Sequence, residues 1–345
     1  MPGSLREAAA ARLEFRREAK AMGWWQVDAD TLADSRFVVS PYAEALACLK
    51  TLARGAAGHP GERAWLDAHL PAYRARLAAD PVAGELVAAG LLRPWNADFL
   101  TPTPTGAPGV SFEEELRAVR ATPADAARAD VAVSLGGRLP ERLRRDDLPH
   151  LAAELLAWVW RETVLPDWPR RRRVIEADIV ARTAQVGQGG WASALDTLRP
   201  GTRWLGASRL QINVRDYPPR DVSGARLLFV PVVPRTGWVS WHLPQQRYAL
   251  VYPCAGVLAE TGSAAPPESL GRLLGPARAR VLALLDTPKS TTQLVALTGQ
   301  GLGSVGRHLK VLLDARLVVR RRAGRSVLYY RTAAGEVLVA AQRAG

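Results

Sequence analysis

Residues 302–331 have the sequence LGSVGRHLKVLLDARLVVRRRAGRSVLYYR, and this stretch decides the fold of the C-terminal quarter of the chain. Aliphatic residues spaced i, i+4 and i+7 predict a helix over 302–314, because that spacing places them on one face. Two runs rich in β-branched and aromatic residues follow, around a glycine-containing turn, and predict a β-hairpin over 317–331. The aliphatic face consists of Val305, Leu309 and Leu312.

The predicted helix carries a basic face opposite its aliphatic face. Glycines let the backbone approach a surface closely, and an arginine there can reach a guanine edge or a phosphate. We therefore predict that the helix lies in the major groove of double-stranded DNA, with the hairpin tip on phosphates or a minor groove. For His308, a phosphate contact and a half-buried packing role are both open. The residues predicted to contact DNA are Gly303, Ser304, Gly306, Arg307, His308, Lys310, Arg322 and Arg325.

Further elements complete the C-terminal segment. A helix is predicted over 270–285, and the S-x-x-Q pattern from Ser290 to Gln293 is a capping box that opens a short second helix. Residues 298–301 predict a tight turn, and Thr332 can cap a final helix. The order helix, helix, turn, helix, hairpin, helix is that of a winged helix-turn-helix.

Four blocks of this segment match a known pattern: Thr291-Thr292-Gln293-Leu294, Ser304-Val305-Gly306-Arg307-His308-Leu309-Lys310-Val311-Leu312, Leu317-Val318 and Gly324-Arg325-Ser326-Val327-Leu328-Tyr329-Tyr330. With them the segment resembles the ArsR-type, or arsenic-repressor-like, winged-helix regulators. The resemblance implies a transcriptional regulator, usually a repressor, that binds an inverted repeat as a homodimer. It also implies that the helices flanking the winged core pair the subunits.

The segment departs from the family pattern in two ways. Leu302 stands where recognition helices of the family often carry a polar residue, and Gly303 and Gly306 stand where they carry serines. Fewer base contacts are therefore expected. Residues 265–345 also contain no cysteine, and His308 is their only histidine. We therefore expect no metal site of the ArsR kind.

The distribution of charge supports a polyanionic partner. The chain holds 46 Lys+Arg and 33 Asp+Glu, a formal net charge of +13. Residues 265–345 hold 13 Lys+Arg and 4 Asp+Glu, a net charge of +9. Residues 1–264 hold the remaining 33 Lys+Arg and 29 Asp+Glu, a net charge of only +4. The chain uses arginine far more often than lysine, which is typical of a GC-rich genome. Such a bias alone does not concentrate the positive charge in one segment.

The rest of the chain predicts a larger, mostly helical domain with a small antiparallel sheet, so the fold class is α+β. Ser40-Pro41 predicts the start of a helix that runs to about Ala53. Residues 148–165 have aliphatic side chains at helical spacing. Apolar runs separated by Pro and Gly predict the strands, which are Thr202–Val214, Arg226–Val233, Trp238–His242 and Tyr248–Tyr252.

The size of this larger domain exceeds what dimerisation requires, so we expect it to sense a small-molecule effector or a partner. Asp30–Phe37 and Ser40-Pro41 resemble the long N-terminal region of actinobacterial ArsR-type regulators. Two prolines and little apolar content mark a boundary before the C-terminal segment. The predicted parts are an N-terminal extension at 1–25, a regulatory domain at 26–259, a linker at 260–268 and the winged helix-turn-helix at 269–345.

Composition also bears on location and on other function classes. Cys48 and Cys254 are too few and too far apart for a disulfide framework, and the charged first 25 residues lack a signal-peptide core, so a cytoplasmic protein is expected. No stretch approaches the ~18 apolar residues of a membrane span. No cofactor, catalytic residue or metal site is predicted.

Two alternatives remain open at this point. One is an enzyme that uses the large domain, for which Cys254 with His242 is the nearest support, although a buried thiol explains Cys254 better. The other is RNA as the target, which the absence of aromatic residues from 302–314 disfavours.

Overall fold

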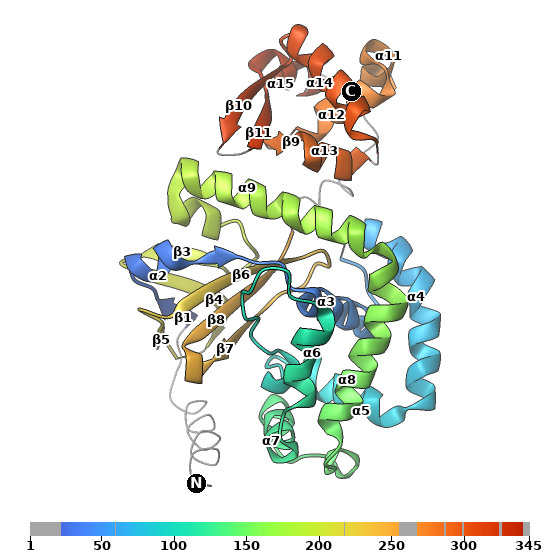
Figure 1. Cartoon of the computed structure of the whole chain (residues 1–345), viewed down its shortest axis with the longest axis vertical. Helices are drawn as coiled ribbons and strands as arrows, with labels where there is room; N and C mark the ends of the chain where they lie inside the picture. Colours follow the sequence, from blue (N-terminus) through green and yellow to red (C-terminus); the bar gives the residue numbers. More distant parts are fainter. Residues whose placement is uncertain are drawn as a thin grey trace. The chain divides into compact units, whose positions relative to one another are not determined.

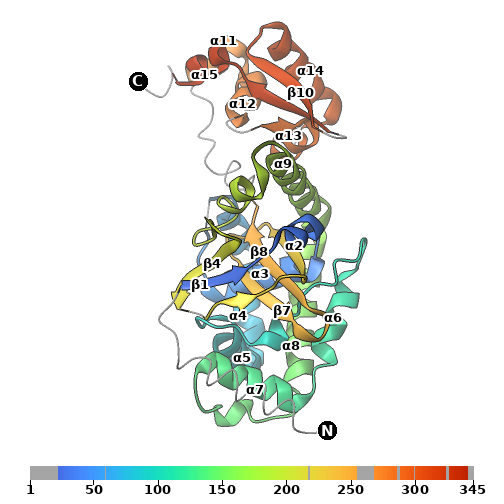
Figure 2. The same ribbon diagram turned by 90° about the vertical axis from the view of Figure 1, so that its left-hand side faces the viewer.

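The computed structural model describes residues 22–58, 60–216, 218–254, 268–285, 288–298, 300–323 and 326–340. They form a mixed α/β structure, as predicted from the sequence, and divide into two compact units (Figure 1, Figure 2). Within these described ranges, no helix is both long and apolar enough to cross a membrane. Unit 1 comprises Met1–Trp168 and Trp191–Pro253, and unit 2 comprises Pro169–Gly190 and Cys254–Gly345.

Helix α3 (Pro41–Arg54) is the centre of the helical part of unit 1. It begins as the sequence predicts, because the Ser40 hydroxyl accepts a hydrogen bond from the Ala43 amide at 3.0 Å. Gly55, with a φ of 63°, ends it. Every residue from Pro41 to Leu52 is buried. The longer helices that accompany it in unit 1 are α4 (Pro60–Ala79), α5 (Pro81–Leu91), α6 (Phe112–Arg120), α7 (Ala124–Leu135) and α8 (Leu148–Val159), which continues as a π-helical turn (Trp160–Val164).

Unit 1 also contains two four-stranded sheets, with strand orders β3-β4-β1-β5 and β2-β6-β8-β7. The prediction of one small antiparallel sheet is therefore wrong. Strand β6 runs parallel to β2 and to β8, and β1 runs parallel to β5. The strands are β1 (Met22–Gln26), β2 (Arg36–Phe37), β3 (Arg203–Gly206), β4 (Arg209–Asp216), β5 (Arg220–Asp221), β6 (Arg226–Val232), β7 (Trp238–His242) and β8 (Arg247–Pro253).

Strand β6 explains why its apolar run led to the wrong prediction of an antiparallel sheet, because β6 is covered on both faces. Leu228 and Val230 belong to the core that α3 and α8 share. Leu227 and Phe229 belong to a second core, to which β1 and β4 contribute. A strand that is buried on both faces is apolar without interruption, and such runs are typical of parallel pairing rather than of a half-exposed antiparallel sheet.

The first two strands lie before the four strands that the sequence analysis assigned to the sheet. β1 begins at Met22, so the predicted end of the N-terminal extension at residue 25 falls inside a strand, and residues 1–21 lie outside the described ranges. Between β1 and β2, helix α2 (Ala29–Asp34) is capped by Asp28, whose carboxylate accepts a hydrogen bond from the Thr31 amide at 2.7 Å. The segment adds one strand to each sheet.

Unit 2 has its own apolar core and a three-stranded sheet of order β10-β11-β9. The helix predicted over 270–285 is two helices, because Gly275 (φ 81°) and Pro276 interrupt it. Of the predicted linker, only Glu268 is described, and it starts a helix. The elements are α11 (Glu268–Leu274), α12 (Pro276–Leu284), β9 (Lys289–Ser290), α13 (Thr291–Thr298), α14 (Leu302–Asp314), β10 (Val318–Ala323), β11 (Ser326–Arg331) and α15 (Ala333–Ala340).

Helix α9 (Trp168–Leu195) contributes to both units. Its backbone leaves helical geometry at Gly190, which has φ 70° and ψ 177°. Pro169–Gly190 groups with unit 2, whereas the sequence analysis assigned it to the larger domain. The Gln293 side chain of α13 donates a hydrogen bond to the Ala177 carbonyl at 2.5 Å, so this part of α9 is fastened to α13 within unit 2.

Two helix starts predicted for unit 2 are confirmed. The Gln293 amide donates to the Ser290 hydroxyl at 3.2 Å, and the Ser290 amide donates to the Gln293 side chain at 2.5 Å, which completes the capping box. The Thr332 hydroxyl accepts a hydrogen bond from the Gly335 amide at 3.1 Å at the start of α15.

Candidate functional site

Helix α14 separates an aliphatic face from a basic face. Val305, Leu309 and Leu312 are at most 1% exposed and pack in the core of unit 2, as their spacing predicts. The helix begins after Gly301, and Asp314 at its end is its only acidic residue. The exposed side carries the predicted contact residues Gly303, Gly306, Arg307 and Lys310. The apolar side chains of Leu302 and Val311 are exposed as well, by 63% and 43%.

This exposed side of α14 is open and positively charged. A Cβ atom added at Gly306 would meet no atom within 4 Å. The Cβ of Gly303 would meet only the tip of the Arg307 side chain, at 4.0 Å. Neither Arg307 nor Lys310 has an ion-pair partner among the residues that the structure describes. Because no carboxylate neutralises them, the face presents a positive potential to solvent.

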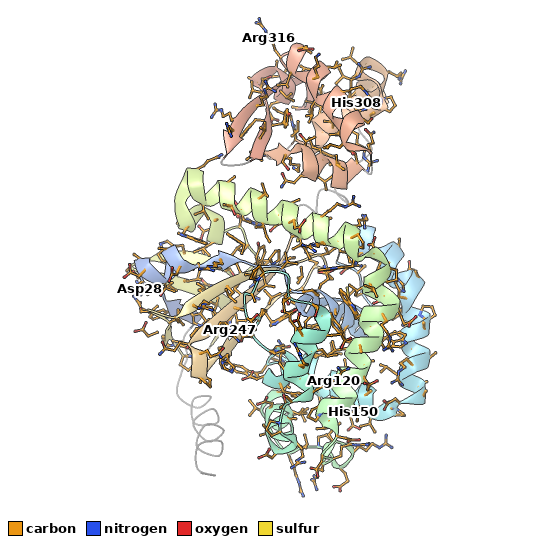
Figure 3. The ribbon with its side chains drawn as sticks, viewed as in Figure 1. Asp28, Arg120, His150, Arg247, His308 and Arg316 are labelled. Carbon is orange, nitrogen blue, oxygen red and sulfur yellow. The ribbon has the colours of Figure 1, made fainter. Side chains whose placement is uncertain are left out.

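The two remaining predicted residues of α14 contact each other. The Ser304 hydroxyl lies 3.3 Å from His308 Nε2 and 3.4 Å from the Gln300 side-chain oxygen. Both Ser304 and His308 are half-buried on the flank of the helix (His308 is labelled in Figure 3). Of the two roles left open for His308, half-buried packing describes its position, and a phosphate contact would require the ring to turn outward.

A basic residue that the sequence analysis missed follows α14. Arg316 has a φ of 54°, in the left-handed region where glycine is usual after a helix. Its amide donates to the Leu313 carbonyl at 2.9 Å, and the Leu317 amide donates to the Leu312 carbonyl at 3.0 Å. The Thr332 hydroxyl donates to the Arg316 carbonyl at 2.7 Å. These bonds hold an exposed arginine between α14 and β10, where its side chain projects from the ribbon (Figure 3).

Strands β10 and β11 form the predicted hairpin, with Arg320 opposite Tyr329 and Arg322 opposite Val327. Val318, at the base of the hairpin, is 1% exposed and anchors it in the core. The distal half is basic, and Arg325 lies outside the described residues. Arg320 and Arg321 were not singled out from the sequence, although alternation along a strand places Arg320 on the same face as Arg322. The exposed arginines of β10 are Arg320, Arg321 and Arg322.

The base of the hairpin is fixed against the last helix. A Cβ atom at Gly335 would come within 2.2 Å of the Leu317 carbonyl oxygen, so only glycine fits where α15 passes β10. On the other edge, Leu328 of β11 pairs with Ser290 of β9. The hairpin and α14 are therefore held in one fixed arrangement within unit 2.

The structure offers no support for the pair of residues behind the enzyme alternative. His242 is exposed and pairs with Arg247, the first residue of β8, whereas Cys254 follows the last residue of that strand and is 1% exposed. Seven residues of extended strand separate the two positions by roughly 23 Å, at about 3.3 Å per residue. In the described part of the chain, no three His, Cys, Asp or Glu side chains gather into a metal-binding group.

No family model, no curated protein and no solved structure matches the chain.

Proposed function

We propose that unit 2 is a winged helix-turn-helix that binds double-stranded DNA, and that the protein regulates transcription. The observation that carries this proposal is the exposed face of α14, where Arg307 and Lys310 stand beside two glycines opposite a fully buried aliphatic face. In this proposal α13 and α14 form the helix-turn-helix, α14 is the recognition helix, and β10 with β11 is the wing.

The dimensions of α14 support the proposal. Its 13 residues make a helix about 20 Å long, at ~1.5 Å per residue. A helix of about 10–12 Å diameter fits the ~12 Å width of the major groove. The glycines reduce the diameter on the exposed side, so that the backbone can approach base edges and phosphates. Arg307 then reaches a guanine edge, and Lys310 reaches a phosphate.

The position of the hairpin supports the same function. Three consecutive exposed arginines in β10 form an arm whose base is fixed by Val318 and by the contact at Gly335. Arg321 lies 5.8 Å from the ring centroid of Tyr330, which stiffens the arm through a cation–π contact. A rigid basic arm beside a recognition helix positions a protein on the phosphate backbone, where binding is strongly salt-dependent.

We test the proposal by fluorescence anisotropy with a labelled 30-base-pair duplex and with the same sequence as a single strand. The protein is expected to prefer the duplex, with an affinity that falls linearly in log–log plots against salt concentration. Arg322→Ala should lower the magnitude of this slope by about one for every sequence, because it removes one phosphate contact.

A matched control is Arg117→Ala, which removes the same charge from a side chain that is 70% exposed on α6 of unit 1. It should leave duplex binding unchanged. Single-strand binding that equals duplex binding, or RNA duplex binding that exceeds DNA binding, would contradict the proposal. Equal loss of affinity on all sequences for Arg307→Ala would show that this residue contacts only phosphate.

The proposal extends to a homodimer. The helices that flank the core of unit 2 carry large apolar side chains in solvent: Leu273 of α11 is 65% exposed and Val337 of α15 is 68% exposed. Self-association through these helices would cover both side chains. Sedimentation equilibrium is expected to show a dimer, and Leu273→Glu is expected to shift it toward monomer.

Unit 1 is proposed to sense a ligand and to alter DNA binding through the chain that joins the units. Trp191 stacks on Phe37 and Phe229 in the core of unit 1, with ring centroids 5.9 and 5.3 Å apart. The residue before Trp191 ends the segment Pro169–Gly190, which the hydrogen bond at Ala177 ties to α13 in unit 2. A metabolite library that never changes the unfolding of unit 1 or the affinity for DNA would remove this part of the proposal.

A further inference from the structure

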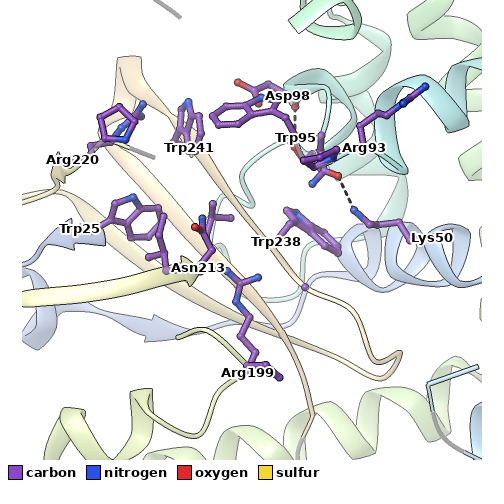
Figure 4. Close-up of a pocket in the computed structure, with 18 of the residues that line it drawn as sticks. Trp25, Lys50, Arg93, Trp95, Asp98, Arg199, Asn213, Arg220, Trp238 and Trp241 are labelled. Carbon is purple, nitrogen blue, oxygen red and sulfur yellow. Dashed lines mark hydrogen bonds between the residues drawn. The ribbon is translucent and has the colours of Figure 1, made fainter. Parts of the chain in front are cut away.

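Unit 1 contains a cavity of about 320 Å³ where its two sheets approach the N-terminal helices, and its lining is unusual in composition. The volume is within the range of small-molecule sites in proteins. The lining side chains come from seven separate segments of the chain and converge on one space (Figure 4). Aromatic and cationic groups dominate it.

Five cations line the cavity against one carboxylate, that of Asp98: Lys50, Arg54, Arg93, Arg199 and Arg220. In the part of the chain that the structure describes, none of the five cations forms an ion pair. Lys50 is buried, Arg199 and Arg220 are half-buried, and Arg54 and Arg93 are exposed. Cations that are shielded from water without a counter-ion oppose folding, so chains rarely gather them without compensation. The charge of this cavity therefore matches an anion.

Neutral groups of the protein satisfy these cations only in part. The Lys50 ammonium donates to the Asn96 side-chain oxygen at 2.7 Å, and the Arg54 guanidinium donates to the Thr236 hydroxyl at 3.1 Å. Arg199 donates to the Thr202 hydroxyl at 3.2 Å and also to the Ile212 carbonyl. One or two neutral acceptors for each cation leave donors available and leave the positive charge unbalanced.

One wall of the cavity keeps two donors without an acceptor. The Arg220 guanidinium lies 4.3 Å from the ring centroid of Trp241 (Figure 4). Arg220 Nη1 and Trp241 Nε1 are both buried, and neither has a hydrogen-bond partner among the described residues. Unsatisfied buried donors are rare in folded proteins and often mark the place of an acceptor that the chain does not supply. An oxygen of a bound anion would supply it.

Four indole rings supply the apolar part of the lining, and they are arranged as edges and faces around it. The ring centroids of Trp95 and Trp241 lie 5.5 Å apart in an edge-to-face pair. The Lys50 ammonium lies 5.5 Å from the ring centroid of Trp238 (Figure 4). Such rings pack against a planar aromatic ligand better than against a compact inorganic ion. The four rings are Trp25, Trp95, Trp238 and Trp241.

We infer that this cavity binds a small aromatic anion, with the ring against the indole rings and the acidic group among Lys50, Arg199 and Arg220. The inference concerns unit 1 alone and is independent of DNA binding. A carboxylate and a phosphate share the chemistry that these cations select, and the experiment below separates them.

Lys50 makes binding dependent on pH. Burial, with smaller contributions from the charges of Arg54 and Arg199, lowers the pKa of Lys50 to about 7. The groups that face its ammonium are the Asn96 amide, the Trp238 ring and these two guanidinium groups. An anion beside Lys50 stabilises the charged form and raises this pKa. Binding above pH 7 therefore takes up a proton, and affinity falls as the pH rises from 7 to 9.

The test is isothermal titration calorimetry of the full chain with 1-naphthoate, 1-naphthyl phosphate, 1-naphthamide and cyclohexanecarboxylate. At least one of the two aromatic anions is expected to bind ten times more tightly than the neutral amide and than the non-aromatic acid. Whichever of the two aromatic anions binds more tightly shows whether the site prefers a carboxylate or a phosphate. At pH 8, titrations in HEPES and in Tris should give different heats, because proton uptake draws on the buffer.

Variants locate the site. Arg220→Met should weaken binding of the preferred anion at least tenfold, whereas Arg203→Met, which removes the same charge from an exposed position on β3, should leave it unchanged. Equal weakening by both variants would assign the effect to net charge and overturn the inference. Equal affinity for the amide and the anions, or no binding of any probe at millimolar concentration, would also overturn it, whether or not Arg220→Met folds.

Discussion

Replacing Lys50 by methionine should stabilise unit 1 at neutral pH while it removes a cation from the cavity. The lysine is 3% exposed, and its pKa falls from 10.5 to about 7 in the folded protein. The difference of about 3.5 between the two values corresponds to about 5 kcal/mol, at ~1.36 kcal/mol per pKa unit. A lowered pKa means that the unfolded chain binds more protons between pH 7 and pH 10.5. The free energy of unfolding of the wild type therefore rises as the pH rises from 7 to 10.5. The contribution of neutral Lys50 is lost as the pH falls through this window to about 7.

Tryptophan fluorescence isolates this effect, because all 11 tryptophans of the chain belong to unit 1. Urea unfolding followed by this signal should show a stability difference between Lys50→Met and wild type that grows by about 3 kcal/mol from pH 9 to pH 6. Contributions that do not depend on pH, such as the lost hydrogen bond to Asn96, cancel in this comparison. If the free energies of unfolding of the two proteins changed in parallel with pH, the placement of a charged lysine in a low-dielectric site would be refuted.

Four further predictions follow from the structure. Burial raises the pKa of Glu115 to about 7 against the opposing hydrogen bonds from the Tyr42 amide and the Ser40 hydroxyl. The stability that Glu115 contributes is therefore present below about pH 4.5 and lost as the pH rises through 7. The free energy of unfolding of Glu115→Gln, relative to that of the wild type, should accordingly increase by about 2–3 kcal/mol as the pH rises from 5 to 8. Tryptophan fluorescence in urea measures this difference. Gly335→Ala should destabilise unit 2 by about 1–3 kcal/mol through overpacking, seen by circular dichroism, while the fluorescence transition of unit 1 stays in place. Arg316→Gly should stabilise unit 2 by about 0.5–1 kcal/mol, because glycine adopts a positive φ without strain, and should weaken duplex binding by removing a cation. Saturating 1-naphthoate should change the dissociation constant for duplex DNA, and saturating duplex should change the dissociation constant for 1-naphthoate by the same factor, as linkage requires. A dissociation constant for duplex DNA that saturating 1-naphthoate leaves unchanged would exclude coupling between the two sites.

The sequence predicted unit 2 better than unit 1, because the signals in unit 2 are local. The spacing of Val305, Leu309 and Leu312 spans eight residues, and the capping box from Ser290 to Gln293 spans four. Both are confirmed. The wrong prediction in this region, a single helix over 270–285, also concerned a local signal. Gly275 and Pro276, which interrupt that helix, are adjacent in the sequence and could have predicted the break. The contact of Gln293 with Ala177 was not available, because 116 residues separate the two.

Unit 1 depends on contacts that no local pattern encodes. Strand β6 lies beside β2 and β8, so its pairing was determined by segments before residue 38 and after residue 246. The candidate DNA-contacting residues could be predicted from one helix and one hairpin, whereas the cavity gathers side chains from Trp25 to Trp241. One signal was available, since Lys50 stands in an otherwise largely apolar helix where a buried charge needs an explanation.

Hydrogen bonds to neutral groups explain individual cavity cations, but they do not explain why several cations gather around one cavity. This gathering is the reason to treat the cavity as a ligand site. Arg199 illustrates the limit: burial lowers its pKa to about 10, although it donates to the Thr202 hydroxyl and the Ile212 carbonyl. Natural proteins retain such destabilising groups where function requires them. Arg199 also follows Leu195 and Leu198, which pack in the same core as Trp191, and Trp191 directly follows the part of α9 that belongs to unit 2. In our proposal, an anion that engages Arg199 acts on the nine residues from Trp191 to Arg199, which lead from the cavity to unit 2, the proposed DNA-binding unit.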